Sequence, residues 1–172
     1  EGKAGRRAVR DRVDTQADFR DGLLTFESVF NRKTRLACRL KDRGDRWELS
    51  ELAFAGTRKT GRLKGEGYWP KSPDAPLSIV LKGTGISLEE LPLLKERFPR
   101  LAGTVDLDLL LEGTRADPRA LLQARSPAVR IGSGEGQSFE LSGSWTPKTL
   151  FFERLRLGKT LSASGSMGLK PG

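Results

Sequence analysis

The sequence LAGTVDLDLLLEG, residues 101–113, decides the fold because its side chains alternate. Every second residue from Val105 to Leu111 is apolar, and an extended strand places these residues on one side. The residues between them are polar except Leu110. The stretch therefore predicts a half-buried β-strand with one apolar face and one wet face. Leu110 is the exception, and we expect it to contact a short helix.

Two short helices are expected to flank this strand. Ser87 and Glu90 have the spacing of a capping box, which predicts a helix over residues 87–98 whose leucines share one face. Asp117–Pro118 has the chemistry of an N-cap followed by a first-turn proline, which predicts one or two helical turns over residues 117–122.

Five strands are predicted before the central one. Each alternates apolar with polar residues and is bounded by turn chemistry. The Gly and Asp content of residues 41–45 predicts a turn, and a change of phase near Ser50 or Glu51 predicts a bulge. The five strands lie within residues 23–30, 35–41, 47–54, 61–69 and 77–81.

Short alternating segments also follow the central strand, within residues 128–131, 138–144, 150–157 and 161–169. About ten strands with short connections predict a mostly β protein, an elongated, curved and antiparallel-rich sheet forming a β-groove, with one or two short helices. The glycine-rich residues 132–138 are expected to be a hairpin loop. We expect residues 21–172 to be a single β-groove segment cut from a longer repeat-containing chain, with residues 1–20 as a linker or frayed strand.

The composition argues against an enzyme. The chain of 172 residues has no histidine and one cysteine, so neither a Ser-His-Asp site nor an internal disulfide can form. No cofactor and no catalytic or metal-ligating set is predicted. A divalent-cation site at Asp106, Asp108 and Glu112 is a minor alternative, since alternation on a wet face explains these acids. Cys38 is expected to be a small buried hydrophobe.

The net charge is +9, and residues 1–66 hold 17 basic against 11 acidic residues. The signs are interspersed, which favours a solvated sheet face over a polyanion site. Trp47, Tyr68 and Trp69 lie near arginines in the sequence and leave nucleic-acid stacking as a minor alternative. No apolar run approaches the roughly 20 residues that a membrane helix needs, so we expect any anchor to lie outside this piece.

The run ISLEELPLLKERFPRLAGTVDLDLLLEGTRADPRALLQARSPAVRIGSGEG, residues 86–136, resembles the repeated unit of the TamB and AsmA-like family of Gram-negative envelopes. The matching features are a short leucine-rich helix, the strand LAGTVDLDLLLEGT, a DP-containing step and short strands after it. The tail LFFERLRLGKTLSASGSMGLKPG is similar to the strands that follow in those proteins. The resemblance covers residues 77–172 well and residues 21–70 in general style.

The resemblance implies a long sheet curled into a trough (a β-taco) with an apolar inner surface. Proteins of this family, which includes the translocation and assembly module protein TamB, are tethered to the inner membrane and cross the periplasm. They are linked to phospholipid movement between membranes and to outer-membrane protein assembly. The expected partners are therefore phospholipid acyl chains and an outer-membrane assembly protein, with no nucleic acid.

Apolar residues of the later strands are predicted to line this groove. A closed sandwich or barrel core built from the same residues is one alternative, and a module that binds a partner strand at exposed sheet edges is another. The predicted lining residues are Leu77, Ile79, Leu81, Val105, Leu107, Leu109, Leu111, Phe139, Leu141, Leu155, Leu157, Leu161 and Ala163.

Overall fold

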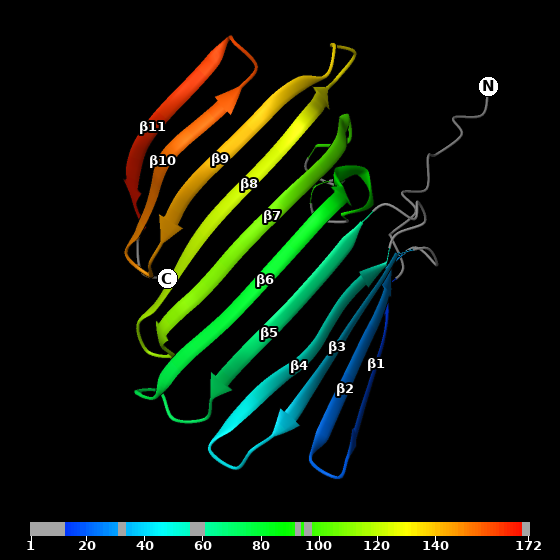
Figure 1. Ribbon diagram of the computed structural model, residues 1–172, viewed down its shortest axis with the longest axis vertical. Coiled ribbons are helices and arrows are strands. Elements are labelled where there is room, and N and C mark those ends of the chain that lie inside the picture. Colours follow the sequence, from blue (N-terminus) through cyan, green and yellow to red (C-terminus); the bar gives the residue numbers. More distant parts are fainter. Residues whose placement is uncertain (1–12, 31–33, 56–60, 92–93, 95–97, 170–172) are drawn as a thin grey trace, which may run out of the picture.

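A computed structural model describes residues 13–30, 34–55, 61–91, 94 and 98–169. The described residues form one antiparallel sheet of eleven strands, in which each strand pairs with the next along the chain (Figure 1). The expected mostly β, antiparallel architecture is confirmed. The strands are β1 (Val13–Arg20), β2 (Leu23–Phe30), β3 (Thr34–Asp42), β4 (Arg46–Ala55), β5 (Arg62–Pro70), β6 (Pro76–Ser87), β7 (Leu101–Thr114), β8 (Pro118–Ile131), β9 (Gln137–Trp145), β10 (Thr149–Leu157) and β11 (Leu161–Gly168).

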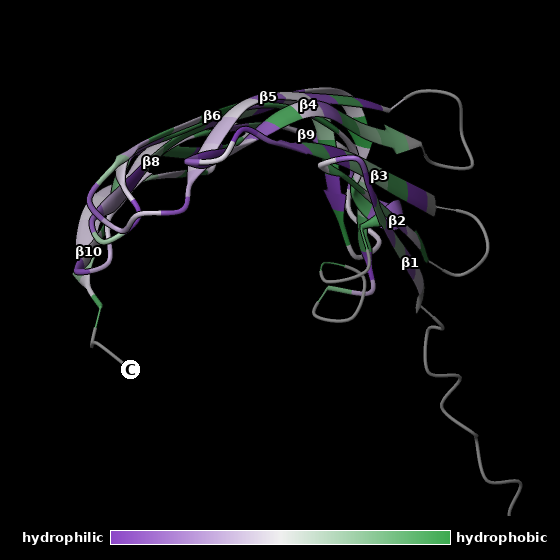
Figure 2. Ribbon diagram, turned by 90° about the horizontal axis from the view of Figure 1, so that it is seen from below, coloured by the Kyte–Doolittle hydropathy of each residue, from purple (hydrophilic) through white to green (hydrophobic). Residues whose placement is uncertain are grey.

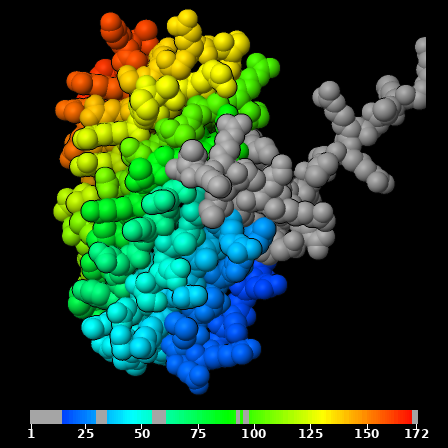
Figure 3. Space-filling view, turned by 45° about the vertical axis from the view of Figure 1, so that its right-hand side comes forward, coloured from blue at the N-terminus to red at the C-terminus, as the bar shows by residue number. Residues whose placement is uncertain are grey.

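The sheet is open and curved. Seen from below it forms an arch, with β1 near one foot and β10 near the other (Figure 2). In the space-filling view the coloured strands follow one another over a continuous surface (Figure 3). Among the described strands, β1 pairs only with β2 and β11 only with β10, so the sheet does not close on itself. A closed barrel or sandwich core, the sealed alternative, is contradicted.

The register places apolar residues of neighbouring strands opposite one another. In the middle of the sheet Leu109 of β7 pairs with Leu81 of β6 and Leu122 of β8. Directly paired residues of an antiparallel sheet lie on the same face, so the apolar positions of each strand extend those of its neighbour. The alternation in each strand thereby becomes a single apolar face across the whole sheet.

Leu88, Leu91 and Leu94, which we call the leucine cap, cover one end of this apolar face. They lie in the connection between β6 and β7, which Figure 2 shows beneath the arch. They pack with a buried cluster that includes Ile86 and Val105. The apolar face is therefore the concave one, and we call the end under these leucines the capped end.

The helix expected over residues 87–98 is confirmed only in part. A short 3₁₀ helix spans Leu88–Glu90, and the amide of Phe98 donates to the carbonyl of Leu94 at 2.7 Å, as in one helical turn. Residues 92–93 and 95–97 lie outside the described residues. Ser87 is the N-cap residue of this 3₁₀ helix, but the capping hydrogen bond predicted for its side chain is wrong, because the side chain makes none.

The helical turns expected over residues 117–122 are wrong. Pro118 begins β8, a strand of 14 residues that also includes the segment at 128–131. Asp117 belongs to the preceding turn, where its amide donates to Thr114 Oγ1 at 3.0 Å. Pairing of Ala120 and Leu122 with the apolar side of β7 outweighs the weak helical signal of the Asp-Pro pair.

Leu110 does not belong to the concave face, and the helix contact expected for it is wrong. It pairs with Val80 of β6 and Leu121 of β8 on the convex side, opposite the face that the leucine cap covers.

The bulge expected near Ser50 or Glu51 is confirmed. Arg39 pairs with Glu51 and Leu40 with Leu49, which leaves Ser50 as the extra residue. Residues 13–20, expected to be a linker or frayed strand, form edge strand β1, and residues 1–12 lie outside the described residues.

Stability should depend on the capped end more than on the middle of the sheet. Ile86 is 4% exposed within the buried cluster, so Ile86→Ala leaves a cavity and should lower the free energy of unfolding by about 3 kcal/mol. Leu109 is half-buried and outside this cluster, so Leu109→Ala should lower the free energy of unfolding by only about 1 kcal/mol. Urea denaturation measures both, and equal losses would contradict this division of the concave face.

Candidate functional site

The structure brings all the predicted lining residues onto the concave face. Ile79 pairs with Leu111, one step along from the Leu81–Leu109 pair in the middle of the sheet. In the last strands a row of direct partners runs from Leu141 through Leu155 to Ala163. A second row runs from Phe139 through Leu157 to Leu161. The remaining three positions, Leu77, Val105 and Leu107, occupy alternate positions on the same sides of β6 and β7.

These residues differ in how far they are covered. Leu77 and Val105 are buried, whereas Leu161 and Ala163 on edge strand β11 are exposed. The others are half-buried, including Leu81 and Leu109 in the middle of the face. The concave face thus has a partly exposed apolar middle between buried residues at its two ends, Val105 at the capped end and Leu77 at the opposite end.

The register adds concave residues that the sequence did not identify as a site. Leu36 pairs with Phe54, and Phe54 pairs with Leu63, so the early strands extend the same face toward β1. Leu122 and Ala124 of β8 join it between β7 and β9. Leu122 and Ala124 were missed because residues 117–122 were expected to be helical. The alternation of apolar and polar residues in β8 is the signal that could have identified them.

A glycine lets apolar side chains meet in the middle of the concave face. A Cβ added at Gly65 would lie 2.7 Å from Leu81 Cδ2 and 3.0 Å from Leu52 Cβ. The side chains of Leu52 and Leu81 therefore lie over the bare backbone of β5. A larger residue at this position would push these leucines apart, so Gly65 keeps the face continuous between β4 and β6.

Aromatic side chains gather at the other end of the concave face, away from the leucine cap. The rings of Phe19 and Trp47 meet edge to face, with centroids 6.1 Å apart. Trp69 is the direct partner of Trp47. Lys71 Nζ lies 5.1 Å from the centroid of the Trp47 ring and donates to both carboxylate oxygens of Asp42, at 2.7 and 2.8 Å. The hydrogen bond from Lys71, followed by that from the Gly44 amide, lowers the pKa of Asp42 below its ordinary value.

The convex face is charged and carries exposed ion pairs. Arg39 Nη1 lies 2.9 Å from Glu51 Oε2, and Arg154 Nη1 lies 3.1 Å from Glu140 Oε1. Such exposed pairs contribute little to stability but keep this face hydrated. Tyr68 also lies on the convex side, under the guanidinium of Arg46, and alternation places it opposite its neighbour Trp69. The aromatic residues that suggested nucleic-acid stacking therefore do not form one platform.

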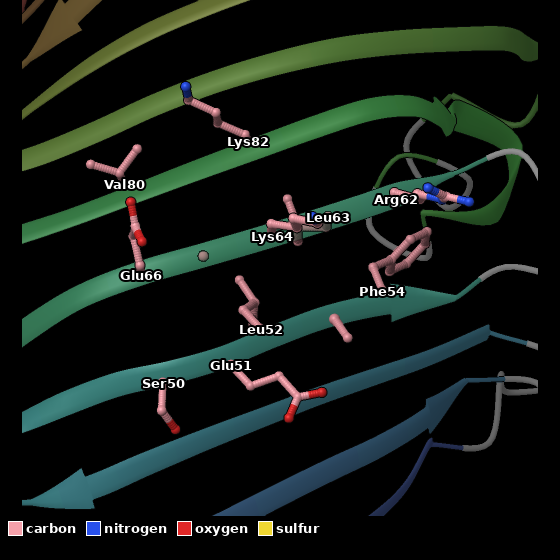
Figure 4. A pocket seen from close by; sticks show the side chains of 12 residues that line it. Ser50, Glu51, Leu52, Phe54, Arg62, Leu63, Lys64, Glu66, Val80 and Lys82 are labelled. Atoms are coloured by element: carbon pink, nitrogen blue, oxygen red, sulfur yellow. The ribbon is translucent and has the colours of Figure 1, made fainter.

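A hollow of about 570 Å³ lies at a seam between β4 and β5 (Figure 4). Regular pairing of these strands breaks between Leu49 and Phe54, next to the bulge at Ser50. Figure 4 shows charges of both signs around it, with Lys64, Glu66 and Glu51 among them. The mixed charges do not define one class of ligand.

The acids of β7 make no metal centre in this arrangement. Asp106 Oδ1 accepts a hydrogen bond from the Gly85 amide at 2.7 Å. Within the part of the chain that the structure describes, no group of three or more His, Cys, Asp or Glu side chains is placed to hold a metal ion. Cys38 is a half-buried thiol on the concave side of β3, and burial raises its pKa.

Comparisons with known proteins give no relative for this chain. No protein-family model, curated protein or solved structure matches it. Among the described residues, no helix has the length and apolar character to cross a bilayer.

The pKa of the Asp42 carboxyl should depend on its partner Lys71 at the aromatic end of the concave face. Lys71→Met should raise the pKa of Asp42 toward its ordinary value, because the largest cause of the lowering is removed. Since the folded-state pKa is below the unfolded one, the pair stabilises the fold above the unfolded pKa, and this stabilisation is lost as the pH falls through the folded pKa. Carboxyl NMR titration measures the shift. An unchanged Asp42 midpoint in the variant would show that Lys71 is not its partner in solution.

Proposed function

We propose that this chain is a non-enzymatic lipid-binding module of the TamB and AsmA-like type. On this proposal the concave face shields phospholipid acyl chains from water. The observation that supports it most is the partly exposed apolar middle of that face, where Leu81, Leu109 and Leu122 form a row outside the buried cluster. A contiguous apolar surface that the described residues leave partly exposed favours an apolar occupant.

The energetics of such an occupant are favourable. Each methylene that leaves water contributes about 0.8 kcal/mol, so a chain lying along the leucine row gains several kcal/mol before the cost of ordering it. The interspersed charges of the convex face would stay in water. One sheet would thus separate a lipid tail from the aqueous phase without closing into a barrel.

The setting we propose is the periplasm of a Gram-negative-type envelope, with the full-length protein anchored in the inner membrane. There the module would carry acyl chains between inner and outer membranes, support outer-membrane protein assembly, or do both. This setting rests on the sequence resemblance, and the open apolar sheet is compatible with it.

A second candidate is a module that binds an added strand, and the open edges of the sheet favour it. Every residue of β11 is exposed, and β11 pairs on one side only among the described strands. Such an edge can accept an extended segment of an assembly partner or of a neighbouring repeat. Crosslinking at β11 distinguishes this candidate from lipid binding, because a strand partner is held by the backbone rather than by the concave face.

Lipid binding can be tested with two neighbouring leucines that lie on opposite faces. Leu109→Arg puts a charge into the concave face and should remove most co-purifying phospholipid, whereas Leu110→Arg changes the convex face and should leave it bound. Native mass spectrometry of protein purified without detergent from a Gram-negative host measures the lipid. Thermal unfolding confirms that both variants are folded.

Two results would overturn the proposal. One is wild-type protein that carries no phospholipid and takes none up from added lipid. The other is folded Leu109→Arg protein that retains as much lipid as the wild type.

A further inference from the structure

All three tryptophans of the chain lie at one end of the sheet, which we call the tryptophan end. Trp47 is the second residue of β4, Trp69 is next to last in β5, and Trp145 is the last residue of β9. This end carries the turns that follow the odd-numbered strands from β1 to β9, along the lower left edge of the sheet in Figure 1. It is opposite the end that the leucine cap covers.

The tryptophans belong to the concave face and remain accessible. Trp47 and Trp69 are direct partners, and Trp145 pairs with Ala120 on one side and Leu150 on the other. Trp69 is 40% exposed, and the other two are half-buried. Phe19, which packs on Trp47, is 57% exposed. Aromatic side chains that meet solvent therefore lie at this end of the concave face, with Phe19, Trp47 and Trp69 on β1, β4 and β5 and Trp145 on β9.

The turns at the tryptophan end and the strand residues next to them carry nearly balanced charge. Counted with the strand ends Arg20, Asp42 and Arg46, they comprise residues 20–22, 42–46, 71–75, 115–117 and 146–148, and hold six basic and five acidic residues. Each turn has at least one basic residue, and four of the five also have an acidic one. Such a rim complements the phosphate and the ammonium of a zwitterionic phospholipid headgroup, and it has no large excess of charge for a polyanion.

Tryptophan at an apolar-to-polar boundary has a well-defined preference. Its ring is apolar but carries an N–H donor, so it concentrates at the headgroup level of bilayers, often with basic residues nearby. The spacing points the same way. Trp69 and Trp145 are four strands apart, about 19 Å along the edge of a sheet, whereas the anchor residues of a protein interface cluster compactly. Aromatic residues spread along one edge in this way suit a flat membrane surface.

We propose that the tryptophan end docks in the headgroup layer of a zwitterionic phospholipid bilayer, with Trp69 and Phe19 inserted at the boundary. The concave face would then meet the membrane at its uncapped end. This inference goes beyond the proposed function, because it concerns the end of the sheet rather than the concave middle, and either can fail while the other stands.

The tryptophans themselves report on this docking, because there are none elsewhere in the chain. Phosphatidylcholine vesicles should shift the tryptophan emission of the wild-type protein to the blue, and brominated phosphatidylcholine should quench it. Raising the salt from low to high should change the affinity less than about twofold, because the rim is nearly neutral. Quenching in the wild type does not depend on whether any variant folds.

Matched variants locate the contact. Trp69→Ala and Phe19→Ala should each weaken vesicle co-sedimentation by about tenfold, since each removes a large exposed aromatic surface. Phe98→Ala is the control, because Phe98 is 56% exposed but lies in the connection at the capped end, and it should bind as the wild type does. Leu109→Arg should also keep its vesicle binding, which separates docking from lipid loading on the concave face.

Several results would overturn the inference. Absence of binding to phosphatidylcholine vesicles would do so, as would equal weakening by Phe98→Ala and Trp69→Ala. Binding that requires anionic lipid and disappears at high salt would assign the contact to basic side chains instead. A folded wild-type protein whose tryptophans are shielded only by a protein partner would replace the bilayer with a protein interface.

Discussion

The register between strands is the constraint on which the rest of the structure depends. Leu81, Leu109 and Leu122 lie side by side only because β6, β7 and β8 are paired in this alignment. A slip of one residue between two strands would turn the apolar side of one of them toward water. Repeated over all eleven strands, this pairing selects a single continuous apolar face. The meander maintains the alignment because each strand pairs with the one before it.

The open apolar face follows from this register and from the small supply of covering residues. The leucine cap packs on Ile86 and Val105 and leaves the middle of the sheet partly exposed. An all-antiparallel sheet ordinarily has one face in a core and the other in water. Here the described residues supply a second layer for one end only. This shortage of cover, rather than any polar chemistry, is what makes the concave face the candidate site.

Alternation was sufficient to predict β2 to β7, β9 to β11 and the side on which Val105 and Leu109 lie, because a period of two has a direct geometric meaning. Local chemistry was less reliable. Asp117–Pro118 has the chemistry of a helix start, but cross-strand pairing made Pro118 the first residue of β8. Ser87 stands at the start of a 3₁₀ helix of only three residues, and its side chain makes no capping hydrogen bond. The convex row of Val80, Leu110 and Leu121, and the gathering of the tryptophans at one end, depend on register and curvature, which no single stretch of sequence contains.

We propose that the middle of the concave face is apolar, is left partly exposed by the described residues, and becomes covered when a lipid binds. Methyl NMR with a water-soluble paramagnetic agent tests this most directly, by comparing Leu109 with Ile86 in lipid-free protein. The account predicts strong relaxation enhancement at the Leu109 methyls and little at Ile86, with the Leu109 enhancement falling when phospholipid is added. Equal protection of both residues without lipid, or an enhancement at Leu109 that phospholipid does not reduce, would contradict it.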